Sequence, residues 1–391
     1  MPESNPRSFP QHKPQGPLGQ YNKSRLIFLA VLILLSIFLL VLVLIIIPRG
    51  QVEHAIRGPE AFRPHQTREL EASLARRTYP LADKLVFVSR EELVCEDYQG
   101  RQIFAYALNM TRPSVQVMDN YLIVGDREGG QVVIINPNGL VFECQLDSSF
   151  VHAALNKDGS WAFLDEQSDD KALVHLVSPE GKRILTLSFA KSGNALNLEF
   201  SPDGRYLDVL ILNTASSNLK SLVRRYDLEG GLVAQKVVEA YNTLFYGLTH
   251  APDGLPIIYS SNHVLKLDFD QEENLQDVEL SSILAVYPHG QDLVILGNAQ
   301  PDAYNGLYRF SSAKGLEEIA DQIGRASHIR LTPDRSKIVY AADNLLYTVD
   351  LASLSLGQAQ ALDGEILAYN FYAGTEANVV TSHSAHILSW K

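Results

Sequence analysis

The pattern of hydrophobic and polar positions divides the chain into two different parts. Residues 26–47 form an uninterrupted apolar run, in which Ser36 is the one polar residue. From Tyr79 onward, apolar and polar residues alternate instead with a period of two, and turn-forming residues recur about every 8 to 12 positions. The first pattern predicts a single transmembrane helix, and the second predicts an all-β domain over residues 79–391.

The apolar run has the length of a membrane span. Its 22 residues would form a helix of about 33 Å, enough to cross a hydrocarbon core of roughly 30 Å. A cleaved signal peptide has a shorter apolar region of about 7 to 15 residues. A core helix beside a polar tail would lack partners to bury every face. We therefore expect an uncleaved signal anchor that contacts the lipid bilayer through residues 26–47.

The segments on either side of this run have different characters. Residues 1–25 are rich in Pro, Gln, Asn and Ser without apolar periodicity, which predicts a disordered tail. Residues 48–78 are expected to form a membrane-proximal connector. In its second half, Leu70 and Leu74 have the i, i+4 spacing of a short helix over residues 65–77. An extended strand is the alternative there.

The positive charges near the apolar run indicate an orientation. Lys and Arg residues are nearly balanced on its two sides, but Lys23 and Arg25 lie directly beside it. The positive-inside rule then favours a tail in the cytosol and a large domain outside it. We expect a single-pass protein of a bacterial inner membrane with a periplasmic domain.

The β region consists of repeats of one four-strand unit. Each unit has an apolar strand, a tight turn and further strands, and successive turns are separated by about 36 to 50 residues, as in the blades of β-propellers. Pro sets the first turn dihedral, Asp hydrogen-bonds the backbone and Gly accepts the left-handed exit. The turns are Asn156-Lys157-Asp158-Gly159, Ser201-Pro202-Asp203-Gly204 and Ala251-Pro252-Asp253-Gly254, with weaker versions at Pro288-His289-Gly290, Thr332-Pro333-Asp334-Arg335 and Tyr372-Ala373-Gly374.

Repeats of this kind predict a ring. A four-stranded antiparallel sheet cannot bury both faces alone, whereas radially packed sheets bury each other. The fold class is therefore all-β, a β-propeller of seven or eight blades. The first and last units each show three clear strands, which indicates that the two ends share a blade or lie side by side.

The Pro-Asp-Gly turn after an apolar strand resembles the TolB-like and WD-repeat-like propellers, in which each blade carries such a turn. The resemblance covers roughly residues 79–391 and implies a fold rather than a function. The Gly-His and Trp-Asp dipeptides of true WD repeats are missing. The two tryptophans, Trp161 and Trp390, are too few for the recurrent tryptophan docking of quinone-binding propellers.

Charge and cysteine content exclude some classes of protein. A net charge of −12 opposes binding along a phosphate backbone, so we expect no nucleic-acid partner. Cys95 and Cys144 both lie in apolar strand patterns. We expect two buried free thiols, and a single bridge outside the cytosol is the alternative.

Three histidines are candidates for a functional cluster. His250, His289 and His328 lie at or near the ends of first strands, which line the central channel of a propeller. A ring of imidazoles there could bind a metal or a substrate. Because they occupy different positions relative to their turns, ordinary hydrogen-bonding roles are favoured.

Other polar and aromatic groups are more simply explained by structure. Arg224 and Arg225 form a small basic spot that we interpret as edge protection. Calcium sites are less favoured than solvated acidic hairpins, because the EF-hand ligand order is missing. The acidic groups are Asp165, Glu166, Asp169 and Asp170, and Asp270, Glu272, Glu273 and Asp277. Tyr241, Tyr246, Tyr287, Tyr304 and Tyr308 suit either blade packing or protein contacts on a rim.

The sequence lacks a convincing motif for nucleophilic catalysis or phosphate binding. We therefore assign no catalytic, cofactor or metal residue and expect no cofactor. The favoured function is a membrane-anchored, non-catalytic scaffold that binds other membrane or periplasmic proteins. The alternatives are a hydrolase or lactonase with its site at the channel mouth, and a ligand-binding sensor that signals through the span.

Overall fold

The computed structural model describes residues 62–390, except 168–170, 190–192, 214–219, 240, 242, 272–275, 302–304, 312, 321–325, 358 and 373. The chain divides into two compact units, Met1–Pro59 and Glu60–Lys391, and the described residues all belong to the second. The predicted tail at 1–25 and the predicted span at 26–47 lie outside them. Within the described ranges, no helix is long and apolar enough to cross a membrane.

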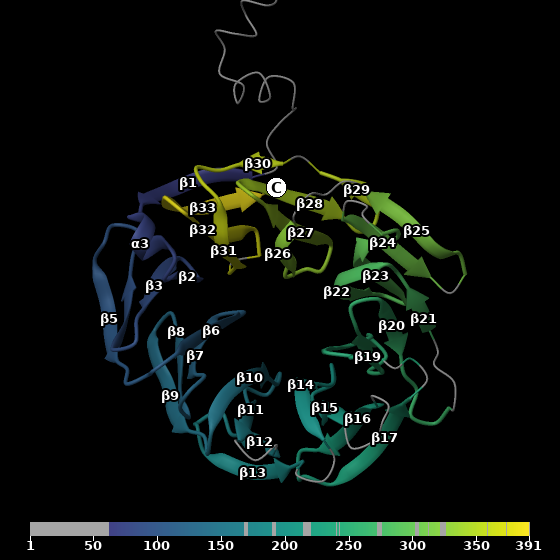
Figure 1. Ribbon diagram of the computed structural model, residues 1–391. Coiled ribbons are helices and arrows are strands. Elements are labelled where there is room, and N and C mark those ends of the chain that lie inside the picture. Colours follow the sequence, from purple (N-terminus) through teal and green to yellow (C-terminus); the bar gives the residue numbers. More distant parts are fainter. Residues whose placement is uncertain are drawn as a thin grey trace, which may run out of the picture. The chain divides into compact units, whose positions relative to one another are not determined.

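The second unit is a β-propeller of eight blades arranged as a ring (Figure 1). Each blade is an antiparallel sheet, and the strand given first for each blade below is the innermost one. Because there are eight such sheets, eight is the correct one of the two predicted blade numbers. Blades 1 to 4 are β2(Thr78–Leu81), β3(Lys84–Val88), β4(Glu92–Glu96), β5(Gln102–Ala107); β6(Pro113–Met118), β7(Tyr121–Asp126), β8(Gln131–Asn136), β9(Gly139–Gln145); β10(Ser149–Leu155), β11(Trp161–Gln167), β12(Lys171–Val177), β13(Arg183–Ser188); and β14(Asn194–Phe200), β15(Tyr206–Asn213), β16(Lys220–Asp227), β17(Leu232–Val238).

The remaining four blades follow the same order, with small departures in the last two. Blades 5 to 8 are β18(Gly247–His250), β19(Pro256–Tyr259), β20(His263–Lys266), β21(Gln276–Glu279); β22(Ser282–His289), β23(Asp292–Asn298), β24(Gly306–Ser311), β25(Gly315–Ala320); β26(Ala326–Leu331), β27(Lys337–Ala342), β28(Leu345–Asp350), with the short β29(Ser355–Leu356) and β30(Gln360–Ala361) both on β28; and β31(Ile366–Phe371), β32(Glu376–Thr381), β33(Ser384–Trp390), with β1(Phe62–Glu69) outermost.

Strand β1 closes the ring by completing blade 8. It pairs antiparallel with β33, from Phe62 opposite Trp390 to Glu69 opposite Ser384. The described part of the chain therefore has its first and last strands in one sheet, as the three-strand end units predicted. Neighbouring strands of a propeller blade otherwise come from adjacent sequence, so this pairing is the longest-range one in the fold.

The predicted helix at residues 65–77 is wrong over its first part. Residues up to Glu69 are extended in β1, which was the alternative, and the helix α3(Ala72–Ala75) has four residues. The i, i+4 leucines are not equivalent, because Leu70 is buried and Leu74 is exposed. The unpaired edge of β33 provides backbone partners for this segment, and that tertiary pairing overrides the local helical pattern.

The repeated Pro-Asp-Gly turn forms a structural corner. In the turn at 201–204, Gly204 has φ of +74° and its N–H donates to the Ser201 carbonyl at 2.8 Å. A Cβ on Gly204 would lie 2.7 Å from Asn156 Oδ1 in blade 3, whose amide donates to the Gly204 carbonyl at 3.1 Å. The glycine thus serves both the left-handed turn and the contact with the neighbouring blade.

Hydrophobic layers between adjacent blades form the core. Between blades 3 and 4, for example, Leu164 and Val174 pack with Leu198 and Val209. Burying such a side chain contributes about 1.5–3 kcal/mol, so these layers hold the blades together. Cys95 and Cys144 are both free thiols, as expected; Cys95 is buried, whereas Cys144 is half-buried. Burial raises the pKa of Cys95 to about 12 and that of Cys144 to about 11.

We predict that Phe62→Ala destabilises the ring strongly. Phe62 is fully buried in the layer that contains Leu388 and Tyr369, and removing such a ring costs about 3–5 kcal/mol. Urea denaturation followed by tryptophan fluorescence measures this loss. Leu140→Ala on the outer strand of blade 2, where Leu140 is exposed, should change stability by less than about 0.5 kcal/mol. Equal effects of the two variants would contradict the role given to β1.

Candidate functional site

The central channel opens into a cavity on the face where the innermost strands end, which we call the turn face. The cavity has a volume of about 570 Å³ and is lined mainly by the strand ends of blades 3 to 6. Leu155, Glu199, His250 and Tyr287 each contribute from one of these blades. We call it the mouth cavity, and its size suits a small ligand.

Side chains cross the rest of the channel in front of blade 1. Arg330 of blade 7 donates through Nη2 to the Val117 carbonyl of blade 2 at 3.4 Å. Asn370 of blade 8 donates through Nδ2 to the Asp119 carbonyl of blade 2 at 2.6 Å. The inner strand of blade 1, β2, has four residues. The two bonds join blade 2 to blades 7 and 8, on either side of this short strand. The mouth cavity accordingly lies toward blades 3 to 6.

A row of charged residues crosses blade 4 beside the mouth cavity. Glu199, Asp208 and Arg225 lie opposite one another on β14, β15 and β16. Arg225 holds the fully buried Asp208 in a bidentate pair, with Nε 2.9 Å from Oδ1 and Nη2 2.7 Å from Oδ2. Bidentate pairs of this kind combine energy with geometric specificity.

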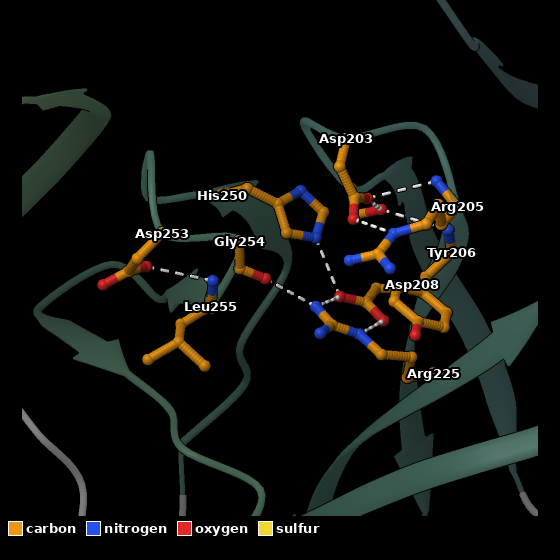
Figure 2. A network of polar contacts seen from close by, with 10 residues as sticks. Asp203, Arg205, Tyr206, Asp208, Arg225, His250, Asp253, Gly254 and Leu255 are labelled. Atoms are coloured by element: carbon orange, nitrogen blue, oxygen red, sulfur yellow. Dashed lines mark hydrogen bonds and ion pairs between the residues drawn. The ribbon is translucent and has the colours of Figure 1, made fainter.

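Blade 5 binds to the same row (Figure 2). His250 Nε2 donates to Asp208 Oδ2 at 2.7 Å, because an ionised carboxylate can only accept. Arg225 Nη2 also donates to the Gly254 carbonyl in the turn of blade 5 at 2.7 Å. Asp208 and Arg225 therefore join blade 4 to blade 5 through buried polar contacts.

Aromatic rings complete the surroundings of Arg225. Its guanidinium carbon lies 5.2 Å from the centre of the Tyr206 ring and 4.8 Å from that of the Phe269 ring. Two ion pairs in the adjacent turns, Asp203 with Arg205 and Asp253 with Lys266, add fixed charge nearby. The positive charge of Arg225 is thus shielded from water on several sides, which strengthens its attraction to Asp208.

Two groups of this network remain available to a ligand. The pKa of Glu199 is raised to about 7, mainly because the carboxyl is buried; His250 and Arg335 act to lower the pKa, and Asp208 acts to raise it. His250 Nδ1 is buried and has no hydrogen-bond partner among the described residues. Both residues line the mouth cavity, so a polar ligand there would meet a carboxyl that titrates near neutrality and a free imidazole nitrogen.

Ser201, the serine among the described residues that line this cavity, is not placed as a nucleophile. The Ser201 hydroxyl donates to Asp203 at 2.6 Å and accepts from the Tyr206 N–H at 3.0 Å. A general base must lie within hydrogen-bonding reach of the proton that it removes. His250 instead uses its one bonded nitrogen to hold Asp208.

The three histidines singled out in the sequence do not converge. His250 is buried at the end of β18 and His289 is half-buried at the end of β22. His328 lies nearer the start of β26 and is exposed. Partial desolvation by neighbouring groups and then the positive charge of Arg330 lower its pKa. None of the three belongs to a group of metal-ligating side chains that the structure describes.

The interpretation of Arg225 as edge protection is wrong. It lies on the third strand of blade 4, with β17 outside it, and its side chain is 12% exposed. The arginine is needed inside the blade because Asp208 is fully buried opposite it. Arg224 is half-buried on the same strand.

The acidic residues have mixed environments. Asp165 is fully buried, which corrects its assignment to a solvated hairpin, whereas Glu166 is exposed. Asp270 and Asp277 are exposed, and Asp277 accepts a bond from the Tyr241 hydroxyl at 2.5 Å. Asp169, Asp170, Glu272 and Glu273 lie outside the described residues.

The tyrosines serve mostly as packing groups. Tyr287 donates to the Ile329 carbonyl of the next blade at 2.9 Å, and Tyr308 is buried between blades 5 and 6. Tyr246 is partly exposed and donates to the Ile283 carbonyl at 3.3 Å. Tyr304 lies outside the described residues.

Glu199 and Asp208 were not predicted from the sequence as site residues. Each is an acidic residue inside an apolar strand, in Leu-Asn-Leu-Glu-Phe and Tyr-Leu-Asp-Val-Leu, and that was the available signal. Period-two alternation places such residues on the polar face of an ordinary half-exposed strand. In a blade packed on both sides the same position is buried. Asp208 has one partner on the next strand of its own blade, Arg225, and one in the neighbouring blade, His250.

Comparison with known proteins supports the fold. A family of unknown function, DUF5711, matches residues 61–253, slightly less than half of the chain. Comparison with curated proteins gives no match. BamB from Moraxella catarrhalis is 14% identical over 85% of this chain and 98% of its own, with a TM-score of 0.55. The Swd1 propeller domain from Myceliophteria thermophila is 14% identical over 72% and 96%, with a TM-score of 0.51. These similarities confirm the predicted β-propeller fold.

We predict that the buried and exposed ion pairs of this network differ sharply in their effect on stability. Asp208→Asn leaves the Arg225 guanidinium without its ionised partner and should lower the free energy of unfolding by about 3–5 kcal/mol. Arg205→Ala removes a pair whose arginine is 73% exposed and should cost no more than about 1 kcal/mol. Thermal and urea denaturation of both variants measure the difference. Similar losses would mean that Asp208 does not hold blades 4 and 5 together.

We predict that Glu199 makes the propeller less stable as pH rises. Its carboxyl has an ordinary pKa of 4.5 and a pKa of about 7 in the folded protein. At pH values between these two, the folded chain therefore holds a proton on Glu199 that the unfolded chain has released. The stability contributed by that proton is present below pH 4.5 and is lost as pH rises through 7. Glu199→Gln should therefore be more stable than the wild type at pH 8, by about 1–2 kcal/mol after solvent screening.

Urea denaturation at pH 4.5 and pH 8 tests the sign of this effect. The advantage of Glu199→Gln should vanish at the lower pH. Glu166→Gln, at an exposed position, serves as the control and should show no such dependence. A Glu199→Gln variant that is less stable at pH 8 would contradict the raised pKa.

Proposed function

We propose that this protein is a membrane-anchored propeller that acts as a non-catalytic binding or assembly module for other membrane or periplasmic proteins. The observation that carries the proposal is the outer strand of blade 4. There Leu232, Val233 and Val237 are 52%, 51% and 45% exposed on the unpaired edge strand β17.

An edge strand of this kind is unusual in a free protein. Exposed edges invite pairing with other chains and are normally protected by charged residues, Pro or bulges. In β17 the lysine is buried, with Lys236 Nζ bonded to the Gln271 carbonyl, so that the irregularity of the β16–β17 ladder at Val233 is the protection that this edge keeps. Other outer strands expose single large apolar residues, such as Ile103, Leu140, Ile184, Leu316 and Leu356. Blade 4 therefore has the surface best suited to a partner.

The partner that fits this edge is an extended segment of another protein. Such a segment would add a strand to β17 through main-chain hydrogen bonds, and apolar side chains would contact Val233 and Val237. Val237 lies in the regular ladder with β16, whereas Val233 is at a register shift between Ala234 and Leu232, and both side chains are exposed. The mouth network is consistent with a binding role, since its buried charges hold blades together rather than surround a nucleophile.

The membrane anchor remains a prediction from residues 26–47. Tethering by this segment would confine the propeller near the bilayer and raise its effective concentration toward other membrane proteins. Binding through a single edge strand is weak in free solution, and the tether would compensate for that weakness.

The test is a pull-down of the full-length chain from detergent-solubilised membranes. We expect a stoichiometric partner to be recovered, and a photo-crosslinking residue in place of Gln235 on β17 to link to it. Val233→Lys with Val237→Lys should reduce recovery at least about tenfold, because lysines oppose strand addition. Leu140→Lys on β9 is the matched control and should leave recovery unchanged. Recovery of the chain alone in several detergents would refute the proposal.

The mouth cavity supports a second candidate function, the binding or hydrolysis of a small polar molecule. The specific observation is the pairing of Glu199 with the free Nδ1 of His250 at a cavity of about 570 Å³. A ligand with both a donor and an acceptor group would satisfy these two atoms. A variant that loses partner recovery but keeps ligand binding, or one that loses ligand binding but keeps partner recovery, would separate the two functions.

A further inference from the structure

A compact group of metal-ligating side chains lies in blade 3, away from the mouth cavity. It consists of Asp147, Asp165 and His175, whose ligand atoms all lie within 4.8 Å of one another. Asp165 is on β11 and His175 on β12, and both side chains are fully buried. Asp147 precedes β10, on the face opposite the turns, and its side chain is 47% exposed.

We propose that these three residues bind a divalent transition-metal ion of the Zn²⁺ class. Imidazole with carboxylates is a typical ligand set for Zn²⁺, whereas Ca²⁺ and Mg²⁺ prefer oxygen alone. Three protein ligands leave a fourth position for water or for a group from another molecule. The exposed side of Asp147 gives that position access to solvent.

The distances suit one ion. His175 Nε2 lies 3.0 Å from Asp165 Oδ2 and 3.8 Å from Asp147 Oδ2. Ligand atoms around a tetrahedral Zn²⁺ with bonds of about 2.0–2.1 Å are roughly 3.3 Å apart. A small movement of the exposed Asp147 side chain would therefore bring all three atoms into position.

The buried carboxylate provides an independent indication of a cation. Asp165 Oδ1 is inaccessible to solvent and has no hydrogen-bond partner among the described residues. Burying an unsatisfied charged oxygen is costly, and the nearby Asp147 carboxylate adds negative charge. Among the described residues, Arg183 provides a nearby cation, with Nη1 3.1 Å from Asp147 Oδ2. The Arg183 side chain is 39% exposed, and its Nη2 is also bonded to the Gln145 carbonyl. Arg183 can retain that second bond when a metal takes its place.

Thr186 would position the imidazole. Its hydroxyl lies 3.0 Å from His175 Nδ1, directly across from β12 on β13. If Nδ1 carries the proton and donates to Thr186, the Nε2 lone pair is free to bind the metal. Histidine ligands usually have such a second hydrogen bond, which fixes their tautomer and orientation.

The test uses the purified full-length chain after chelation of bound metals, with ZnCl₂ and CoCl₂ as probes. We expect one Zn²⁺ per chain by isothermal titration calorimetry, a Tm that rises with Zn²⁺ concentration, and a Co²⁺ absorption spectrum typical of tetrahedral coordination. Asp147→Asn, at an exposed position, should weaken binding at least about tenfold without unfolding the protein. Thr186→Val should weaken it by about tenfold and alter the Co²⁺ spectrum.

Glu166→Gln is the matched control, because this exposed acid lies next to Asp165 in sequence but outside the cluster. It should bind both metals as the wild type does. His175→Gln should abolish binding, and circular dichroism shows whether that variant is folded. If the folded wild type does not bind Zn²⁺ saturably, or if Asp147→Asn binds it as tightly as the wild type, the proposal is wrong.

Discussion

The pairing of β1 with β33 is the contact on which the rest of the structure depends. Each blade presents two apolar faces and needs a neighbour on both sides, so an open row of blades would leave two faces in water. By completing blade 8, β1 links residues more than three hundred positions apart and ends the row. The hydrophobic layers between blades can then all be filled. The entropic cost of pairing β1 with β33 grows only slowly with the length of the chain between them.

Two groups of buried charged residues differ in their place in the propeller: one joins two blades, and the other lies inside a single blade. Asp208, Arg225 and His250 join blades 4 and 5, while Asp165 and His175 lie inside blade 3. In the first group both carboxylate oxygens of Asp208 have partners, which fixes one arrangement of two blades. His250 Nδ1 has no partner among the described residues, and His250 lines the mouth cavity. In the second group the atom without a described partner is the buried Asp165 Oδ1, and an unpaired carboxylate oxygen favours a cation.

Much of the fold was predictable because each blade repeats one local solution. The turn at 201–204 needs Gly for its left-handed dihedral, and the same requirement recurs in other blades, which makes the period visible. The start of the propeller was not predictable, since residues 65–77 have a local pattern that favours a helix. The roles of Arg225 and Asp165 were also misassigned, because their partners lie on other strands that pair in ways no short motif records.

The sequence alone determined the all-β repeat and its blade-like period, because strand alternation and turn chemistry are local properties. It left two arrangements of the chain ends open, of which the shared blade is the one observed. It also supplied the prediction of a membrane anchor. Tertiary structure decided the number of blades, the strand conformation of residues 62–69 and the partners of each buried charge. Those features depend on which strands become neighbours when the ring closes, and that neighbourhood is a property of the whole ring rather than of any segment.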